Sequence, residues 1–484
     1  MTPSLRLLGP LRPRQRRARP HASAILALGA LALLTCSTCS NRRAPLAPPA
    51  ATTTPAPAPP RLEPLLPLPP PTSEAPPTSE APPPGRAPAA GVNGVGGPPN
   101  GTTQPLNLPS FFNRLCDLRA GARSDHVRIA WLGDSHTAAD LWTGAFRHRL
   151  QERYGNGGPG FLHLGWKARA PIRHDGVAFS TRSRWRLEPP TYAQPKRYED
   201  GVLGLGGVRT LPLERDARAR VEVSDPALRG EALRWTLSYR PLVATASADV
   251  VFGDGRPQRL QIEGAEAGLV GKGAPRQRTF RGSDAFEIRG GRGFQFFGVV
   301  AETEAPGLVV DTLGLNGARL ITLLAWDEAS WVAELSRRRP DLVIVAFGTN
   351  ESQEPMGDSR RFGNALEGVV ERARKAAPQA ECLVILPIER GDSAAQERLS
   401  VVAASLALRA KALRCALWDA RTAMGGPGSL SAWQRESPPR AAGDGVHLTT
   451  RGYLALGEAL ARDVLESATR CEQRPSSPVE RPVP

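Results

Sequence analysis

Three short polar blocks follow one another in this 484-residue chain, and the first two come directly after apolar runs. The block Gly-Asp-Ser-His at 133–136 follows the run 126–132, and Gly-Thr-Asn-Glu at 348–351 follows the run 342–347. The third block, Asp-Gly-Val-His at 444–447, lies in a Gly-rich loop before the last helical pattern. Open α/β sheets place their sites at the carboxyl ends of buried strands. The blocks therefore predict an α/β fold with polar side chains at that edge of a parallel sheet.

The blocks contain the parts of a serine esterase. Ser135 would be the nucleophile, and it needs a base because a free hydroxyl is a poor nucleophile. His447 is the only histidine after His174, so a base from the C-terminal half must be His447. Asp444 would orient the imidazole, and the Asn350 amide would donate to the oxyanion. A lone Gly-Asp-Ser is also a common surface turn, but the order and context of the blocks favour catalysis.

These residues resemble the conserved blocks of the SGNH hydrolases, also called the GDSL family. Ser135 matches the first block, Asn350 matches the third, and Asp444 with His447 matches the Asp-x-x-His of the last. The resemblance implies a doubly wound parallel sheet in three layers, flavodoxin-like in topology. It also implies that the three residues Ser135, Asp444 and His447 act as a catalytic triad.

The glycine block of the family is best matched by Leu-Gly-Leu-Asn-Gly-Ala at 313–318. The resemblance implies that Gly317 is the oxyanion glycine, with Gly314 as the alternative. The oxyanion hole would then consist of the backbone N–H groups of Ser135 and Gly317 and the side-chain amide of Asn350.

The resemblance covers roughly residues 120–165 and 305–468. Two positions depart from the family pattern: His136 stands where the family name has leucine, and Glu351 stands where aspartate is common. His136 is interpreted as a packed or solvated histidine; the alternative is that it lines the entrance and contacts substrate.

A long insertion separates the first two family blocks. Ser135 and Gly317 lie 182 positions apart, which divides the hydrolase domain into 108–167 and 306–470. The intervening residues 168–305 are predicted to form a β-sandwich. This arrangement resembles bacterial peptidoglycan O-acetylesterases, in which a β-rich domain like a carbohydrate-binding module interrupts the hydrolase.

Hydrophobic periodicity predicts the order of the elements. The expected helices are 111–118, 138–154, 320–338, 361–377, 394–412 and 450–468. The expected strands of the parallel sheet are 127–132, 308–312, 341–347, 382–387 and 416–418. The expected strands of the insert are 221–223, 233–240, 248–252, 259–263, 285–289 and 293–303.

The N-terminus has the pattern of an export signal. Residues 1–39 begin with an arginine-rich, acid-free stretch, followed by the apolar run 22–34. The run ends at Cys36, with Cys39 close behind, and resembles a bacterial lipoprotein signal with Cys36 as the lipidated residue. Ordinary secretion and an uncleaved anchor are the alternatives. All three place the protein outside the cytoplasm, in the periplasm or cell envelope; lipidation would attach it to the outer membrane.

Two segments are too biased in composition to build a core. Residues 40–107 are Pro-rich, and 22 of the 48 prolines fall between 44 and 109. Such a stretch is extended and disordered, and it would act as a tether. The tail 471–484 is also predicted to be disordered.

The formal charge of +15 does not indicate a nucleic-acid partner. The eight arginines of residues 1–43 account for +8 of it, and no aromatic–basic recognition motif is present. The remaining excess suits an anionic envelope polymer. No spacing indicates a metal site, and no phosphate loop or dinucleotide fingerprint is present, so no cofactor is expected. The sequence does not specify an oligomeric state.

Four cysteines follow the signal. Outside the cytoplasm they could pair, and Cys116 with Cys471 would form a clasp across the folded core. Cys382 and Cys415 precede successive strands and are interpreted as buried thiols.

The sequence therefore predicts a serine esterase that removes O-acetyl groups from an envelope glycan, with peptidoglycan as first choice by resemblance. A glycan O-acetyltransferase using the same triad is one alternative, and a non-catalytic glycan-binding protein is another. The insert would shape the substrate cleft. Its aromatic residues Trp185, Tyr192, Trp235 and Tyr239 would stack on sugars or pack in the core.

Overall fold

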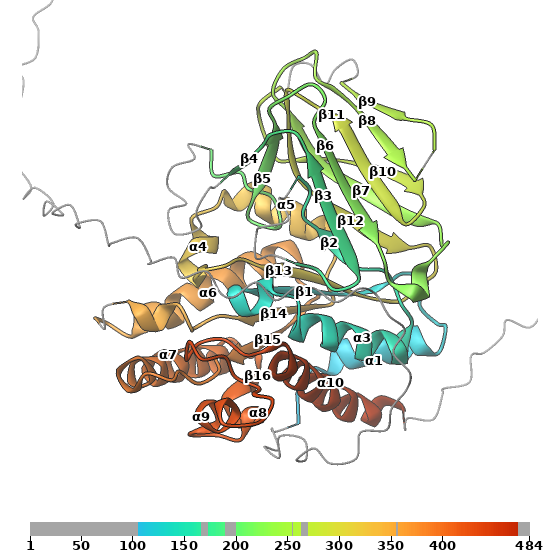
Figure 1. Cartoon of the computed structure of the whole chain (residues 1–484). Coiled ribbons are helices and arrows are strands. Elements are labelled where there is room, and N and C mark those ends of the chain that lie inside the picture. Colours follow the sequence, from blue (N-terminus) through green and yellow to red (C-terminus); the bar gives the residue numbers. More distant parts are fainter. Residues whose placement is uncertain are drawn as a thin grey trace, which may run out of the picture. The chain divides into compact units, whose positions relative to one another are not determined.

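The computed structural model describes residues 105–165, 173–188, 200–253, 255–262, 270–354 and 357–472, with side chains up to Thr469 (Figure 1). The predicted signal with Cys36 and Cys39, the tether before residue 105, Tyr192 and the tail beyond residue 472 lie outside these residues. Within the described part, no helix combines the length and apolar character needed to cross a membrane.

A five-stranded parallel sheet forms the centre of the hydrolase part. Its strands are β1 (Val127–Gly133), β13 (Leu308–Gly314), β14 (Leu342–Ala346), β15 (Glu381–Leu386) and β16 (Ala416–Asp419). Their order in space is β13-β1-β14-β15-β16. Numbered along the chain, this is the order 2-1-3-4-5 of flavodoxin-like sheets. The predicted doubly wound fold is confirmed.

Helices cover both faces of this sheet, because the strand side chains alternate between two apolar layers. Ile129 and Trp131 of β1 point to one layer, and Ala130 and Leu132 point to the other. The first layer is formed with α1 (Pro109–Arg119), α3 (Trp142–Tyr154), α8 (Ala420–Met424), α9 (Ser429–Gln434) and α10 (Thr450–Glu472). The second is formed with α4 (Leu320–Leu324), α5 (Glu328–Arg338), α6 (Arg360–Ala376) and α7 (Ser393–Ala412).

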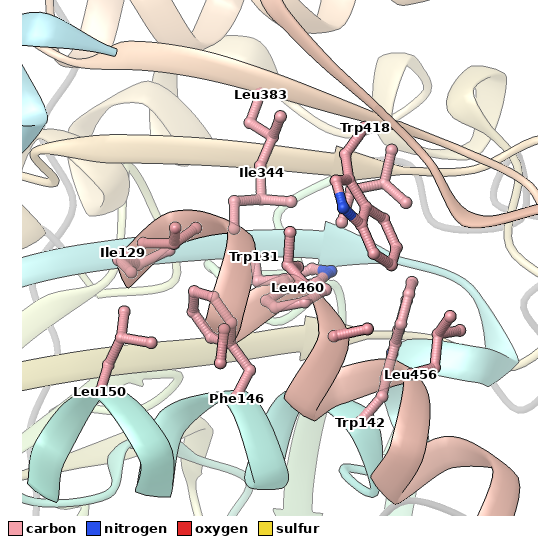
Figure 2. Packing of buried hydrophobic residues seen from close by; sticks show 14 of the residues in the cluster. Ile129, Trp131, Trp142, Phe146, Leu150, Ile344, Leu383, Trp418, Leu456 and Leu460 are labelled. Carbon is pink, nitrogen blue, oxygen red and sulfur yellow. The ribbon is translucent and has the colours of Figure 1, made fainter. Parts of the chain in front are cut away.

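The first layer is centred on Trp131 (Figure 2). Its ring centroid lies 5.1 Å from that of Trp142 and 5.2 Å from that of Phe146. Ile344 and Leu383 extend the same surface along the sheet, and all five side chains are buried. Each such burial contributes about 1.5–3 kcal/mol of hydrophobic stabilisation, so this face holds α3 and α10 firmly beneath the strand ends.

The predicted helix 138–154 is interrupted at Asp140. The structure has α2 (Ser135–Ala138) and then α3, with Asp140 in the left-handed region at φ 46°. The fully buried Asp140 carboxylate accepts hydrogen bonds from Arg147, Thr312 and the Asp175 backbone. These tertiary contacts hold the turn against helix propensity. The predicted helix 320–338 is likewise divided into α4 and α5.

The insert is a sandwich of two antiparallel sheets. One has the order β10-β7-β12-β5-β4 with β2 beside β12, and the other β3-β6-β11-β8-β9. The first contains β2 (Gly160–Leu162), β4 (Trp185–Glu188), β5 (Arg209–Pro212), β7 (Leu233–Pro241), β10 (Arg276–Gly282) and β12 (Phe294–Thr303). The second contains β3 (Val177–Arg182), β6 (Arg218–Val223), β8 (Ser247–Phe252), β9 (Gln258–Gln261) and β11 (Ala285–Gly290).

Side chains from both sheets fill the core of the sandwich. Trp235 stacks on Phe286 at 5.3 Å, and Trp185 and Tyr239 are also buried. These three predicted aromatic residues therefore pack in the core. β2 lies before residue 168 yet pairs with β12, so the antiparallel sheet takes in residues on both sides of the predicted boundary.

A buried ionic cluster joins the insert to the parallel sheet. Glu302 of β12 accepts hydrogen bonds from Arg128 of β1 at 2.8 Å and from Arg338 of α5 at 2.8 Å. Arg338 also donates to Asp311 of β13 at 2.8 Å. Arg128, Glu302, Arg338 and Asp311 form what we call the junction cluster.

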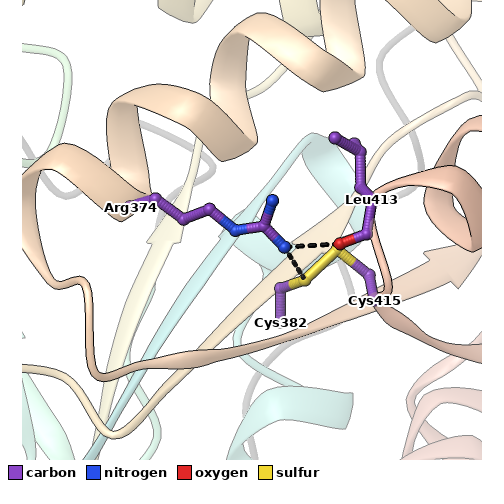
Figure 3. Close-up of a disulfide and its surroundings, with 4 residues drawn as sticks. All are labelled: Arg374, Cys382, Leu413 and Cys415. Atoms are coloured by element: carbon purple, nitrogen blue, oxygen red, sulfur yellow. Dashed lines mark hydrogen bonds between the residues drawn. A yellow bond between two sulfur atoms is a disulfide. The ribbon is translucent and has the colours of Figure 1, made fainter.

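Cys382 and Cys415 form a disulfide between the starts of β15 and β16 (Figure 3). Their Cα atoms are 4.8 Å apart, and Arg374 donates a hydrogen bond to the Leu413 carbonyl beside them. The interpretation of these residues as buried thiols is wrong, because adjacent parallel strands bring them within bonding reach. Cys116 is also disulfide-bonded. The clasp to Cys471 stays a prediction, since that side chain is not described.

Candidate active site

The carboxyl ends of the first three sheet strands bring three of the predicted blocks together. Gly133 lies beside Gly314 on one side and Ala346 on the other. The chain then enters α2 after β1, the glycine block after β13 and the Asn350 block after β14. Asp134 caps α2 by accepting the His136 backbone N–H at 3.0 Å. Burial raises the pKa of Asp134 to about 8, so a neutral cap fits it better than a catalytic carboxylate.

Ser135, His447 and Asp444 form a continuous hydrogen-bonded relay. The Oγ of Ser135 lies 3.1 Å from Nε2 of His447, although the two residues are 312 positions apart. Nδ1 of the same imidazole lies 2.7 Å from Oδ2 of Asp444. This is the geometry of a nucleophile, a base and an orienting carboxylate.

A turn holds the Asp444 carboxylate in place. Its Oδ1 accepts the backbone N–H groups of Val446 and His447, each at 2.9 Å. Burial opposes ionisation of this carboxyl, but the hydrogen bonds from the His447 backbone and side chain outweigh it, so the pKa of Asp444 is lowered. The carboxylate is therefore charged when the imidazole takes a proton. The side chains of His447 and Asp444 are 41% and 49% exposed, which leaves the relay open to a large substrate.

Two of the predicted oxyanion residues, Gly317 and Asn350, lie close together. Asn350 donates from Nδ2 to the Ala318 carbonyl at 2.9 Å, next to Gly317. Gly317 has φ +71°, and a Cβ there would have no atom within 4 Å. Gly314 is different, because its Cβ would lie 2.2 Å from the Ala138 backbone nitrogen of α2. Gly317 thus sits in open space, whereas Gly314 serves close packing.

The model of the GDSL-like lipase/acylhydrolase family matches residues 280–455. This part of the chain is therefore similar to the GDSL-like family. The matched residues include Gly317, Asn350, Asp444 and His447, and the structure supplies Ser135 from the segment before the insert.

One solved structure shares the fold of this chain, and a second shows only a weaker similarity. A peptidoglycan O-acetylesterase structure is 24% identical over 75% of this chain and 96% of its own, with a TM-score of 0.63. A family two carbohydrate esterase from Cellvibrio japonicus is 12% identical over 60% of this chain and 99% of its own, with a TM-score of 0.25. A search of curated protein sequences finds no match.

Glu351 links two loops of the candidate site, a role that its sequence position alone does not reveal. Its buried carboxylate accepts the Leu320 backbone N–H at 2.8 Å and the Gly348 backbone N–H at 3.0 Å. Leu320 follows the Gly317 block and Gly348 begins the Asn350 block. The two loops that carry the predicted oxyanion donors are therefore linked through one side chain. Burial raises the pKa of Glu351 to about 7.

The raised pKa of Glu351 predicts a stability that depends on pH. A carboxyl with a folded pKa near 7 and an ordinary pKa of 4.5 stabilises the fold below about pH 4.5, and this contribution is lost as the pH rises through 7. Between pH 4.5 and 7.5, the free-energy difference between wild type and Glu351→Gln should change by about 3 kcal/mol, with wild type relatively more stable in acid. Urea unfolding of both proteins at both pH values measures this free-energy difference. Glu354→Gln is the control, and an equal difference at both pH values would contradict the assignment.

His136 lies beside the imidazole of His447. Its ring centroid is 5.2 Å from that of His447, and its Nδ1 lies 2.7 Å from the Tyr453 hydroxyl. Burial, with the neighbouring His447 charge second, lowers the pKa of His136 to about 3. This buried, neutral position corresponds to the packed histidine of the sequence analysis. Among the described residues, no group of three or more His, Cys, Asp or Glu side chains is arranged to hold a metal ion.

Proposed function

We propose that this chain is a serine esterase that removes O-acetyl groups from an envelope glycan, and that peptidoglycan is its substrate. The observation that carries the proposal is the relay from Ser135 through His447 to Asp444 at the carboxyl edge of the sheet. The family match supports hydrolysis as the reaction class.

The relay supports an acyl-enzyme mechanism. Ser135 Oγ attacks the acetyl carbonyl while His447 Nε2 takes the hydroxyl proton. Asp444 stabilises the resulting imidazolium. The tetrahedral oxyanion is held by the Ser135 and Gly317 N–H groups and the Asn350 amide. His447 then protonates the departing sugar oxygen, and water attacks the acetyl-serine in a second, equivalent step that releases acetate.

Two observations support peptidoglycan as the substrate: the similarity in fold and the solvent exposure of the relay. A solved structure that matches 75% of this chain with a TM-score of 0.63 is a peptidoglycan O-acetylesterase, which supports peptidoglycan as the substrate. The half-exposed relay suits an ester on a polymer, because a chain can lie across an open site without having to enter a closed pocket.

Acetate release from O-acetylated peptidoglycan by the purified protein tests the proposal. We expect release from the polymer and from a small activated acetate ester. Hydrolysis of the small ester alone would retain the esterase and refute the substrate, and acetyl transfer to an added glycan would replace hydrolysis with transfer. Hydrolysis of neither compound would refute the catalytic proposal.

We also propose that the protein acts outside the cytoplasm. The disulfide between Cys382 and Cys415 supports this location, because disulfides form and persist in oxidising compartments. Lipidation at Cys36 and attachment to the outer membrane belong to the same proposal. Globomycin treatment of expressing cells would make a lipoprotein accumulate as its unprocessed precursor and leave an ordinarily secreted protein unchanged.

A further inference from the structure

A second concave site lies on the insert, away from the Ser135 relay. Its volume is about 700 Å³, in the range of small-molecule sites. Residues from three segments, 215–218, 243–249 and 289–293, line it together with Arg259. None of the lining residues belongs to the relay or to the predicted oxyanion hole. We call it the arginine pocket.

The pocket carries an excess of positive charge. Its lining contains Arg215, Arg218, Arg259, Arg289 and Arg292 against Asp216 and Asp249. Two of the five arginines are neutralised, because Arg259 pairs with Asp249 at 2.8 Å and Arg289 pairs with Glu287.

The other three arginines, at positions 215, 218 and 292, make no side-chain hydrogen bond or ion pair with another described residue. Three such arginines lining one concavity attract an oxyanion, since arginine binds carboxylate and phosphate through two parallel hydrogen bonds. A single bound anion would neutralise part of this unpaired charge.

The other polar side chains of the lining can form hydrogen bonds with the hydroxyl groups of a ligand. Asp216, Thr245 and Ser247 offer acceptors and hydroxyls within the same cavity. The two carboxylates disfavour a ligand with many negative charges. The described lining also has no aromatic side chain on which a nucleobase could stack. We propose that the arginine pocket binds an acidic saccharide, with its carboxylate or phosphate on the arginines and its hydroxyls on the remaining polar groups.

Glycines let two loops approach each other closely at the pocket. Gly290, Gly291 and Gly293 all have positive φ, and the Gly293 carbonyl accepts the Leu242 N–H at 2.7 Å. A Cβ on Gly293 would lie 2.7 Å from the Val243 side chain. A larger residue at Gly293 would therefore push apart the two loops that form this part of the pocket.

The pocket and the catalytic domain lie at opposite ends of β6. Arg218 begins this strand at the pocket, while Ser224, just past its other end, donates to the Gly176 carbonyl at 2.8 Å. Asp225 then accepts a hydrogen bond from Asn156 at 2.9 Å. A strand of this length spans roughly 17–20 Å. The saccharide site is thus separate from the ester site, and its existence does not depend on the proposed esterase activity.

Three monosaccharides that share the N-acetylglucosamine ring test whether the full-length protein binds acidic sugars in this pocket. N-acetylglucosamine is neutral, N-acetylmuramic acid adds a carboxylate, and N-acetylglucosamine 6-phosphate adds a phosphate. We expect calorimetry or NMR titration to show at least about tenfold tighter binding of an acidic sugar than of the neutral one. Comparing the two acidic sugars identifies which anion the pocket prefers, and tighter binding of either supports the proposal.

The double variant Arg218→Gln/Arg292→Gln should raise the Kd of the acidic sugar about tenfold. The matched control, Arg229→Gln/Arg281→Gln, removes the same charge from exposed positions of the insert and should leave the Kd unchanged. Thermal unfolding of both variants checks that they are folded. Equal binding of the neutral sugar, or equal loss in the control, would overturn the proposal. So would tighter binding of oligothymidylate that the pocket variant abolishes, since the ligand would then be a nucleic acid.

Discussion

Ser135→Ala and His447→Ala are each expected to lower kcat for acetate-ester hydrolysis by at least about 10³-fold. The reason is that the Oγ and Nε2 atoms lie 3.1 Å apart and act as one unit, and removing either member of such a pair removes nucleophilic catalysis. Steady-state kinetics on a small acetate ester measures the loss. The double variant should be no slower than either single variant, since neither residue acts without the other.

A histidine–aspartate pair outside the site provides the control. Nε2 of His148 lies 3.1 Å from Asp175 on the surface of α3. His148→Ala removes the same kind of contact and should keep wild-type kcat. Retention of full activity by Ser135→Ala would refute the relay, and equal losses in the control would indicate a structural effect.

Arg338→Met is expected to lower the free energy of unfolding by about 3–5 kcal/mol. Removing one partner from a buried ionic group leaves the other charges desolvated and uncompensated, and here Glu302 and Asp311 would both lose a donor. Urea unfolding at pH 7 measures this cost. The neighbouring Arg339→Met is the control, because Arg339 is 66% exposed and exposed pairs contribute only about 0–1 kcal/mol.

The cost of losing Arg338 should also depend on pH. Burial opposes ionisation of Glu302, but Arg338 and Arg128 outweigh it and hold the pKa of Glu302 well below its ordinary 4.5. A lowered folded pKa gives stability that is present above pH 4.5 and is lost as the pH falls. The difference between wild type and Arg338→Met should therefore stay constant from pH 7 to about pH 5 and shrink as the pH falls below 4.5. A difference that grows in acid would contradict this account of the junction cluster.

The parallel sheet could be predicted because its strands are short, apolar runs bounded by polar turns, as in 127–132 and 342–347. Five strands of the insert, namely β2, β3, β4, β5 and β10, were not predicted. β10 shows why: its sequence Arg-Gln-Arg-Thr-Phe-Arg-Gly buries only Phe280 well, so it lacks a hydrophobic period. The break at Asp140 was also missed, since it depends on Thr312 and Asp175, which are distant in sequence.

The candidate site could likewise be predicted from the sequence only in part. Ser135, Asp444 and His447 could be proposed from motif and order, because each provides a chemical group that esterases require. Glu351 could not be assigned a role, because its function comes from two backbone N–H groups in different loops. No fixed spacing of residues in the sequence indicates a side chain that links two loops in this way. The only available indication was glutamate at a position where the family usually has aspartate.

The position of β1 in the sheet has a consequence for how the chain is made. β1 is a central strand, yet its neighbours begin at Leu308 and Leu342, after the whole insert. As the chain emerges during synthesis, β1 has no partner strand until more than 170 further residues have followed it. Closing so long a loop is slow, and an unpaired apolar strand is prone to aggregate in the meantime. An insert that folds first would shorten the gap between β1 and β13, so the sandwich is expected to act as an internal folding aid for the sheet.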